Sequence, residues 1–372
     1  MFGINSYVLV AIAAVPLLLL MINPVRTFLY GLAILGSTVL AGDRIDTHFH
    51  VLPPAYLDAL AAVGGDPSGY PTPDWSLQAS IKSMNSLGTS LSILSISSPG
   101  PSIAGTGENA RNLTRTLNQN LASYAVKSKY KGRLGFFGAL PDFRDVNGTL
   151  KELEFLYEKQ KLCNGVTVFT SYGGKLLGDP EYKPIWTKLQ QYKALVFLHP
   201  TVLDVAPRLI GSGIPQPIID YPLATTRAAV DLVVTGTVRR CPNVDIILSH
   251  AGGTIPFVGG RVISSLGIPD IARLANVTYL QAKKDFGRFY YDIALSTSSA
   301  QLDGLLDFAS SDHVLFGSDF PYVPQFGIDT TVLKYSNYVV NNPRGSQVAS
   351  HVLRNNSLAL LNKHSLHDWS YV

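Results

Sequence analysis

Short apolar runs alternate with stretches of helical periodicity from residue 43 onward. The runs are almost continuously hydrophobic, which is typical of parallel strands buried on both faces. They cover residues 44–50, 90–98, 133–141, 164–170, 195–200, 244–252, 289–295 and 314–322. The helical stretches are clearest at 108–130, 146–160, 181–192, 224–240 and 299–309. This alternation predicts an α/β fold, a (β/α)8 TIM barrel.

The predicted barrel forms one domain. No linker rich in Pro or Ser and no block of charge divides residues 43–372. Terminal helices, including one at 345–362, are expected to cover part of the barrel. The loops 51–73 and 201–223 are rich in Gly and Pro, and both follow the C-terminal ends of predicted strands. Active sites of TIM barrels are built at that face.

The first 42 residues differ from the rest because Arg26 is their only charged residue. Residues 7–22 are apolar throughout, and the uncharged stretch reaches the roughly 20 residues that a membrane-spanning helix needs. We therefore expect 1–42 to be a hydrophobic signal or anchor segment, with membrane association or entry into the secretory pathway. A cleaved signal is a second interpretation. A third is a start-site artefact ahead of a cytosolic protein.

The charge balance argues against nucleic-acid binding. The 372 residues carry 30 Lys and Arg against 26 Asp and Glu, a formal charge of only +4. With 46% hydrophobic and 15% charged residues, the chain has the composition of a folded protein that buries a large core. Two cysteines are too few for a disulfide scaffold. The composition therefore predicts a folded protein of the size of an enzyme.

Four of the eight histidines lie at the predicted C-terminal ends of strands. His48 and His50 end the first strand and share one face because side chains alternate along a strand. His199 ends the fifth strand, His250 the sixth, and Asp319 the eighth. Imidazole nitrogen suits zinc and its first-row neighbours, and a catalytic site needs about three protein ligands. This set predicts a metal site in the barrel mouth.

The remaining histidines are interpreted as structural. His313 precedes the eighth strand, on the opposite face of the barrel. The terminal region contains the other three, His351, His364 and His367. Asp46 shares the face of His48 but lies one layer deeper. Its carboxylate could orient an imidazole or satisfy the core, and the pattern does not choose between these roles.

Four motifs give the chain a resemblance to the amidohydrolase superfamily. They are Ile45-Asp46-Thr47-His48-Phe49-His50, Leu198-His199-Pro200, Ser249-His250-Ala251-Gly252-Gly253 and Phe316-Gly317-Ser318-Asp319-Phe320-Pro321. The resemblance covers about residues 43–330. Within the superfamily it is closest to the branch of aminocarboxymuconate semialdehyde decarboxylase, and there to the fungal 6-methylsalicylate decarboxylases.

The resemblance implies roles for these residues. It makes His48, His50, His199 and Asp319 the ligands of one divalent metal, Zn²⁺ with Mn²⁺ as the alternative. It makes His250 a catalytic acid or base, with Asp319 a second candidate for the proton donor. It also implies no organic cofactor and a homodimer.

A missing lysine favours one metal over two. Binuclear hydrolases of this superfamily bridge their metals with a modified Lys at the end of strand 4. The predicted strand 164–170 contains no Lys, and Lys175 falls in the loop that follows.

A missing arginine bears on the substrate. The relatives that handle dicarboxylates place an Arg in the loop after strand 1, but residues 51–81 contain neither Arg nor Lys. Tyr56, Tyr70 and Trp75 are expected to line the site instead, which suits a flat ring with one carboxylate.

We therefore expect non-oxidative decarboxylation of a hydroxylated aromatic acid, 6-methylsalicylate to 3-methylphenol and CO2, in polyketide secondary metabolism. A mononuclear hydrolase of a lactone or amide is the alternative. A non-catalytic, membrane-tethered barrel is the third interpretation.

Overall fold

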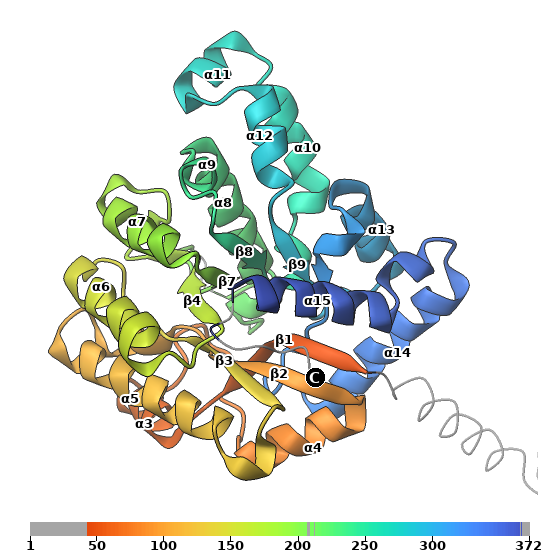
Figure 1. The fold of residues 1–372 in the computed structure, drawn as a ribbon. Helices are drawn as coiled ribbons and strands as arrows, with labels where there is room; N and C mark the ends of the chain where they lie inside the picture. The colour runs from red at the N-terminus through yellow and green to blue at the C-terminus, as the bar shows by residue number, and fades with distance from the viewer. Residues whose placement is uncertain (1–42, 207–208, 212, 365, 367–372) are drawn as a thin grey trace, which may run out of the picture.

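The computed structural model describes residues 43–206, 209–211, 213–364 and 366, which form a barrel surrounded by helices (Figure 1). Eight strands form one sheet in the order β1-β2-β3-β4-β7-β8-β9-β10, and all neighbouring pairs are parallel. The strands are β1 Arg44–Val51, β2 Thr89–Ile96, β3 Leu134–Gly138, β4 Gly165–Phe169, β7 Leu195–His199, β8 Asp245–Leu248, β9 Tyr290–Asp292 and β10 Val314–Leu315. The predicted α/β barrel is confirmed.

Single bridges close the barrel between its last and first strands. Asp46 pairs with Phe316 and Phe49 with Phe320, both in parallel orientation. The last strand is shorter than the predicted run 314–322. It ends at Leu315, and beyond it only the isolated bridges at Phe316 and Phe320 continue the pairing; the φ of 62° at Asp319 is left-handed, so the run to 322 is not extended throughout.

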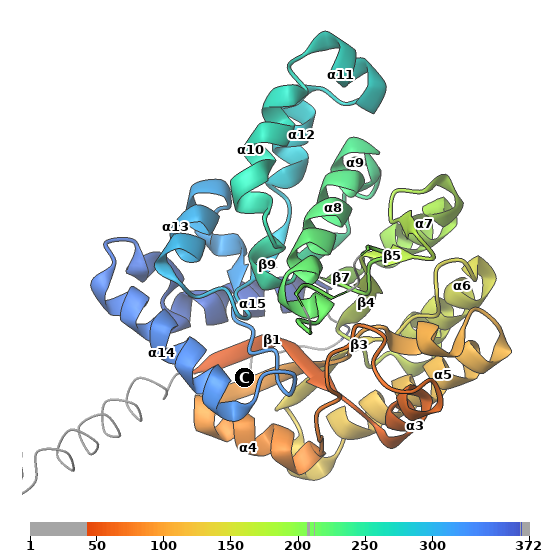
Figure 2. The same ribbon diagram turned by 180° about the vertical axis from the view of Figure 1, so that it is seen from behind.

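Helices follow the strands around the barrel. They are α5 Glu108–Ala125, α6 Val146–Glu154, α7 Lys183–Tyr192, α8 Asp220–Val234, α9 Thr237–Arg240, α10 Ile255–Ser265, α11 Pro269–Ala275, α12 Tyr279–Phe286, α13 Ser299–Phe308, α14 Gln325–Asn341 and α15 Ser350–His364. Figures 1 and 2 both show α10, α11 and α12 projecting beyond the other helices.

The chain after β1 is more regular than predicted. The segment 51–73 was expected to be a loop, but it contains α3 Pro54–Ala62, and α4 Leu77–Leu87 follows it. Pro54 stands at the first position of α3, where its missing N–H costs no hydrogen bond. A short hairpin, β5 Ser171–Tyr172 and β6 Lys175–Leu176, follows β4.

Helix α15 covers the N-terminal end of the barrel, as Figure 1 shows where α15 crosses in front of the strands. Leu360 and Leu361 of α15 join the apolar cluster inside the barrel, with residues such as Phe137 and Phe197. The Asn356 amide donates to carbonyl oxygens of Ser311 and Val314, just where β10 begins. The opposite, C-terminal end of the barrel is therefore the open one.

The predicted membrane-associated or secretory location is corrected. Among residues 43–206, 209–211, 213–364 and 366, no helix combines the length and the apolar character that crossing a bilayer requires. The prediction was wrong on this point. The segment 1–42, on which it depended, lies outside the described residues.

Candidate active site

Three ligand-type side chains meet at the C-terminal end of the barrel. The Nε2 atoms of His48 and His50 lie 3.1 Å apart. Asp319 Oδ1 lies 3.3 Å from each of these nitrogens. Alternation along β1 places both imidazoles on the inner face, and the bridges between β1 and the chain after β10 bring Asp319 beside them.

His199 completes this group from β7, across the barrel. Its ring centroid lies 5.2 Å from that of His48 and 4.7 Å from that of His50. One ligand atom from each of His48, His50, His199 and Asp319 lies within 4.8 Å of all the others, and all four residues are buried. The structure thus brings together the four residues that the sequence predicted as metal ligands.

The protonation of the group suits a cation. Burial lowers the pKa of His50 and holds that of His199 well below its ordinary value, so both imidazoles are neutral. Burial alone would raise the pKa of Asp319, but the hydrogen bond and charge of His48 and the hydrogen bond of His50 hold it well below its usual range. Neutral imidazoles and an ionised carboxylate are the forms that bind metals.

The pKa of His48 indicates that this site favours a positive charge. Burial opposes its charged form, but Asp292 and Asp319 on either side outweigh burial and raise its pKa to about 10. Two carboxylates in a dry site favour a positive charge between them. The donor set therefore fits a divalent metal.

His250 follows β8 in a left-handed backbone conformation, with φ of 54°. Its Nδ1 lies 3.1 Å from the carbonyl oxygen of Ala294, which only accepts, so Nδ1 carries the proton in the neutral ring. Nε2 is then the acceptor atom of the neutral ring. Burial and the charge of His48 lower the pKa of His250. At neutral pH the ring is thus a base.

Asp292, at the end of β9, is a site residue that the sequence interpretation missed. Its Oδ2 lies 3.0 Å from Nδ1 of His48, and its Oδ1 accepts from the backbone N–H of His250 at 3.1 Å. The strand-end test applied to the histidines could not find it, because Asp292 lies in the middle of the predicted run 289–295, whereas the observed strand already ends at Asp292.

Asp46 does not contact an imidazole nitrogen. Its Oδ1 accepts from the backbone N–H groups of His48 and Ser318, at 3.1 and 3.2 Å. Of the two roles left open for Asp46, the structure places it in the core, where it ties β1 to the segment that carries Asp319.

The candidate metal ligands His50, His199 and Asp319 face a cavity of about 300 Å³. His50, His199, His250 and Asp319 line it together with Tyr70, and none of its described lining residues is Lys or Arg. Two of the three aromatic residues expected there lie elsewhere. Tyr56 is buried with its hydroxyl on the Ser97 carbonyl, and the Trp75 indole donates to Ser80.

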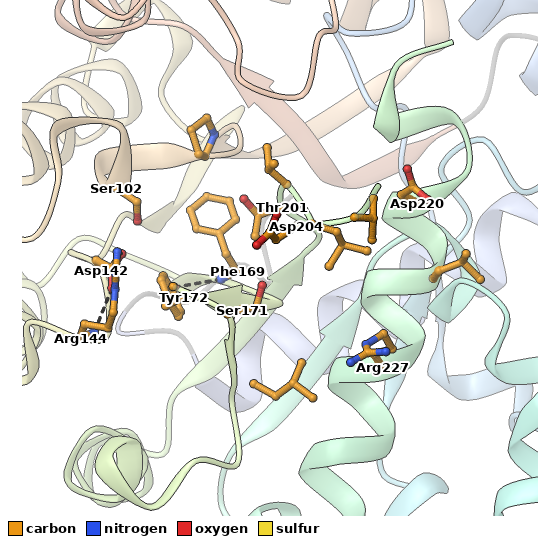
Figure 3. A pocket seen from close by; sticks show the side chains of 18 residues that line it. Ser102, Asp142, Arg144, Phe169, Ser171, Tyr172, Thr201, Asp204, Asp220 and Arg227 are labelled. Carbon is orange, nitrogen blue, oxygen red and sulfur yellow. Dashed lines mark hydrogen bonds and ion pairs between the residues drawn. The ribbon is translucent and has the colours of Figure 1, made fainter. Parts of the chain in front are cut away.

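A second, larger cavity of about 710 Å³ lies beside it. Figure 3 shows Arg144 and Arg227 on opposite sides of this cavity. A hydrogen bond of 2.9 Å from Ser98, which lines the smaller cavity, to Thr201, which lines the larger one, joins the walls of the two cavities. Among the described residues, the candidate metal ligands His50, His199 and Asp319 line the smaller cavity and not the larger one.

The other singled-out residues lie away from the site. Lys175 on β6 pairs with Glu181 at 2.6 Å and cannot bridge metals at the end of β4. His313 Nδ1 contacts the Phe289 carbonyl oxygen, and His364 contacts Asp245. His351 is exposed on α15, and His367 lies outside the described residues.

Comparison with known proteins agrees with this geometry. The sequence pattern of the amidohydrolase family matches residues 45–362. The chain belongs to the amidohydrolase family. It is 37% identical over 329 residues to the Aspergillus niger decarboxylase yanB, covering 86% of this chain and 87% of the relative. It is 38% identical over 299 residues to the 6-methylsalicylic acid decarboxylase of Penicillium expansum, covering 80% and 89%.

A solved structure of this family, amidohydrolase II, superimposes with a TM-score of 0.75 at 28% identity, over 86% of this chain and 100% of that one. The predicted resemblance to the amidohydrolase superfamily, and within it to fungal 6-methylsalicylate decarboxylases, is confirmed.

Proposed function

We propose that this chain is a carboxy-lyase that converts 6-methylsalicylate to 3-methylphenol and CO2. The observation that carries the proposal is its 38% identity to the 6-methylsalicylic acid decarboxylase of Penicillium expansum over most of both chains. The cavity supports it, because no described Lys or Arg lines the space beside His199 and Asp319. A ring with a single carboxylate suits such a cavity better than a dicarboxylate does.

In this proposal His48, His50, His199 and Asp319 hold one divalent metal, Zn²⁺ with Mn²⁺ as the alternative. Such a metal would supply Lewis acidity that balances the negative charge of the substrate's carboxylate and phenolic oxygen. Three imidazoles and one carboxylate are a donor set that zinc accepts. Organic cofactors have no part in the proposed reaction.

The reaction replaces the carboxylate by a proton at one ring carbon. The bond between that carbon and the carboxylate breaks, its electron pair stays on the ring carbon, and CO2 leaves. We assign the proton transfer to His250 or Asp319, since both line the cavity. The Ala294 carbonyl fixes the tautomer of His250, which leaves Nε2 to take up a proton and return it to the ring.

We further propose that residues 43–372 form one catalytic domain, with residues 1–42 outside it. We also propose that the chain acts as a homodimer, which light scattering of the purified protein tests directly.

We propose a role in polyketide secondary metabolism, which follows from the proposed substrate. Deletion of the gene in the producing organism tests this role, because 6-methylsalicylate should then accumulate.

The first experiment is incubation of metal-loaded protein with 6-methylsalicylate, following 3-methylphenol and CO2 by chromatography and mass spectrometry. Both products are expected in equal amounts. A folded, metal-loaded sample that releases neither product, yet hydrolyses an ester or lactone, contradicts the proposal and points to a mononuclear hydrolase.

A further inference from the structure

A strained turn brings an aliphatic side chain to the wall of the smaller cavity. Residues 293–296 form a turn in which the Ser296 N–H donates to the Ile293 carbonyl oxygen at 3.0 Å. Leu295, the third residue of this turn, has φ of 55°. That position of a turn favours Gly or Asn, because a bulky side chain is strained at positive φ. The chain nevertheless has leucine there.

Leu295 is 45% exposed as a residue, and it lines the cavity that also contains His250 and Asp319. Exposed aliphatic surface inside a cavity gains free energy when an apolar group of a ligand covers it. Strained residues that persist at a site commonly serve its function. Both observations point to a role for this side chain in ligand recognition.

The turn also fixes Leu295 relative to the acid-base histidine. The residue before it, Ala294, accepts the hydrogen bond from His250 Nδ1, and the Ala294 N–H donates to Asp292. Leu295 therefore lies beside the residue that we place at the reacting carbon. In 6-methylsalicylate the methyl group is on the ring carbon next to that one.

We infer that Leu295 is a specificity-determining residue that recognises the alkyl group at position 6 of a salicylate ring. The inference rests on the proposed function. It adds the substrate class, 6-alkylsalicylates in preference to salicylate or 2,6-dihydroxybenzoate. Ile218, an exposed aliphatic residue of the same cavity, extends the apolar wall.

The test compares the wild type with Leu295→Gly and Leu295→Asn, two residues that accept positive φ. Leu295→Gly is expected to lower the ratio of kcat/KM for 6-methylsalicylate over salicylate by about 10-fold or more, the usual discrimination of an apolar pocket for one methyl. Its thermal midpoint should stay equal or rise because strain is removed. Leu295→Asn should raise the relative rate on 2,6-dihydroxybenzoate.

Lys161→Gly is the matched control, because Lys161 is an exposed residue with φ of 54° that does not line the cavity. It should leave the substrate ratios unchanged. Ratios for Leu295→Gly that stay within about two-fold of the wild type overturn the inference. The inference is also overturned if Leu295→Gly lowers kcat/KM equally for all substrates and changes the oligomeric mass, because Leu295 is then a subunit contact.

A binding measurement separates this inference from the proposed function. If the wild type turns over none of the three acids, the proposed function fails. Calorimetric titration with 3-methylphenol and phenol then still tests Leu295. A preference of the wild type for 3-methylphenol that Leu295→Gly abolishes supports the inference, and an unchanged preference contradicts it.

Discussion

Asp292 Oδ2 lies 3.0 Å from His48 Nδ1, and both side chains are fully buried. The carboxylate accepts the hydrogen bond of Nδ1–H, so Nε2, which is directed at His50 and Asp319, is the atom of His48 that would bind a metal. The same aspartate accepts from the backbone N–H of His250. One carboxylate therefore orients a proposed metal ligand and the proposed acid-base residue together.

Replacing Asp292 by Asn should weaken metal binding by about 10- to 100-fold, because the amide can donate to Nδ1 and shift the imidazole proton to Nε2. Metal content after dialysis against graded chelator measures this effect. Asp285→Asn is the control, since Asp285 is also buried but pairs with Arg239 and does not belong to the group of candidate metal ligands. Equal metal affinity in Asp292→Asn and the wild type would contradict the orienting role.

The double substitution His48→Ala and His50→Ala should abolish metal binding, because it removes both β1 donors from the group. Metal analysis is expected to fall from about one ion per chain to background, with no decarboxylation left. His313→Ala, at the far end of the barrel, should retain both. A metal-free double variant with full activity would refute the whole site assignment.

His250→Asn should separate chemistry from metal binding. Asparagine accepts the left-handed backbone at this position but cannot carry a proton at neutral pH. We expect kcat to fall by about 100- to 10,000-fold with bound metal unchanged. Single-turnover rates and metal analysis on one preparation measure both. An unchanged kcat would assign the proton transfer to Asp319 alone.

The sequence predicted the residues whose position depends on strand order and alternation. His48, His50 and His199 lie where strand ends of a barrel must meet, so periodicity was enough to bring them together. Asp319 was also found this way, although its left-handed backbone was not.

What the sequence could not predict depends on contacts between distant segments. Asp292 ends a strand of three residues, and only the folded barrel shows that its oxygens reach both β1 and the turn after β8. Leu295 has no turn-forming residue type, so its positive φ is imposed by the hydrogen bonds around it. Trp75 packs beside Tyr124 instead of lining the site, because α4 begins directly after it.

The end of α15 is attached to the barrel by one aspartate at the start of β8. Asp245 Oδ2 lies 2.6 Å from Lys363 Nζ and 2.7 Å from His364 Nε2. Burial alone would raise the pKa of Asp245, but the hydrogen bonds from His364 and Lys363 outweigh it and lower the pKa below its ordinary value.

This lowered pKa predicts an acid-dependent loss of stability. A carboxyl group whose pKa is lower in the folded state stabilises the fold fully above its unfolded pKa, near 4, and loses that contribution as pH falls through the folded value. Asp245→Asn should therefore lower the free energy of unfolding at pH 7 by about 1–3 kcal/mol and flatten its dependence below about pH 4. Urea unfolding between about pH 7 and pH 3 measures both effects. Asp312 is an exposed residue at the same end of the barrel, so Asp312→Asn should show the same pH dependence of unfolding free energy as the wild type. If Asp245→Asn also showed that dependence, the attachment of α15 would not depend on the charge of Asp245.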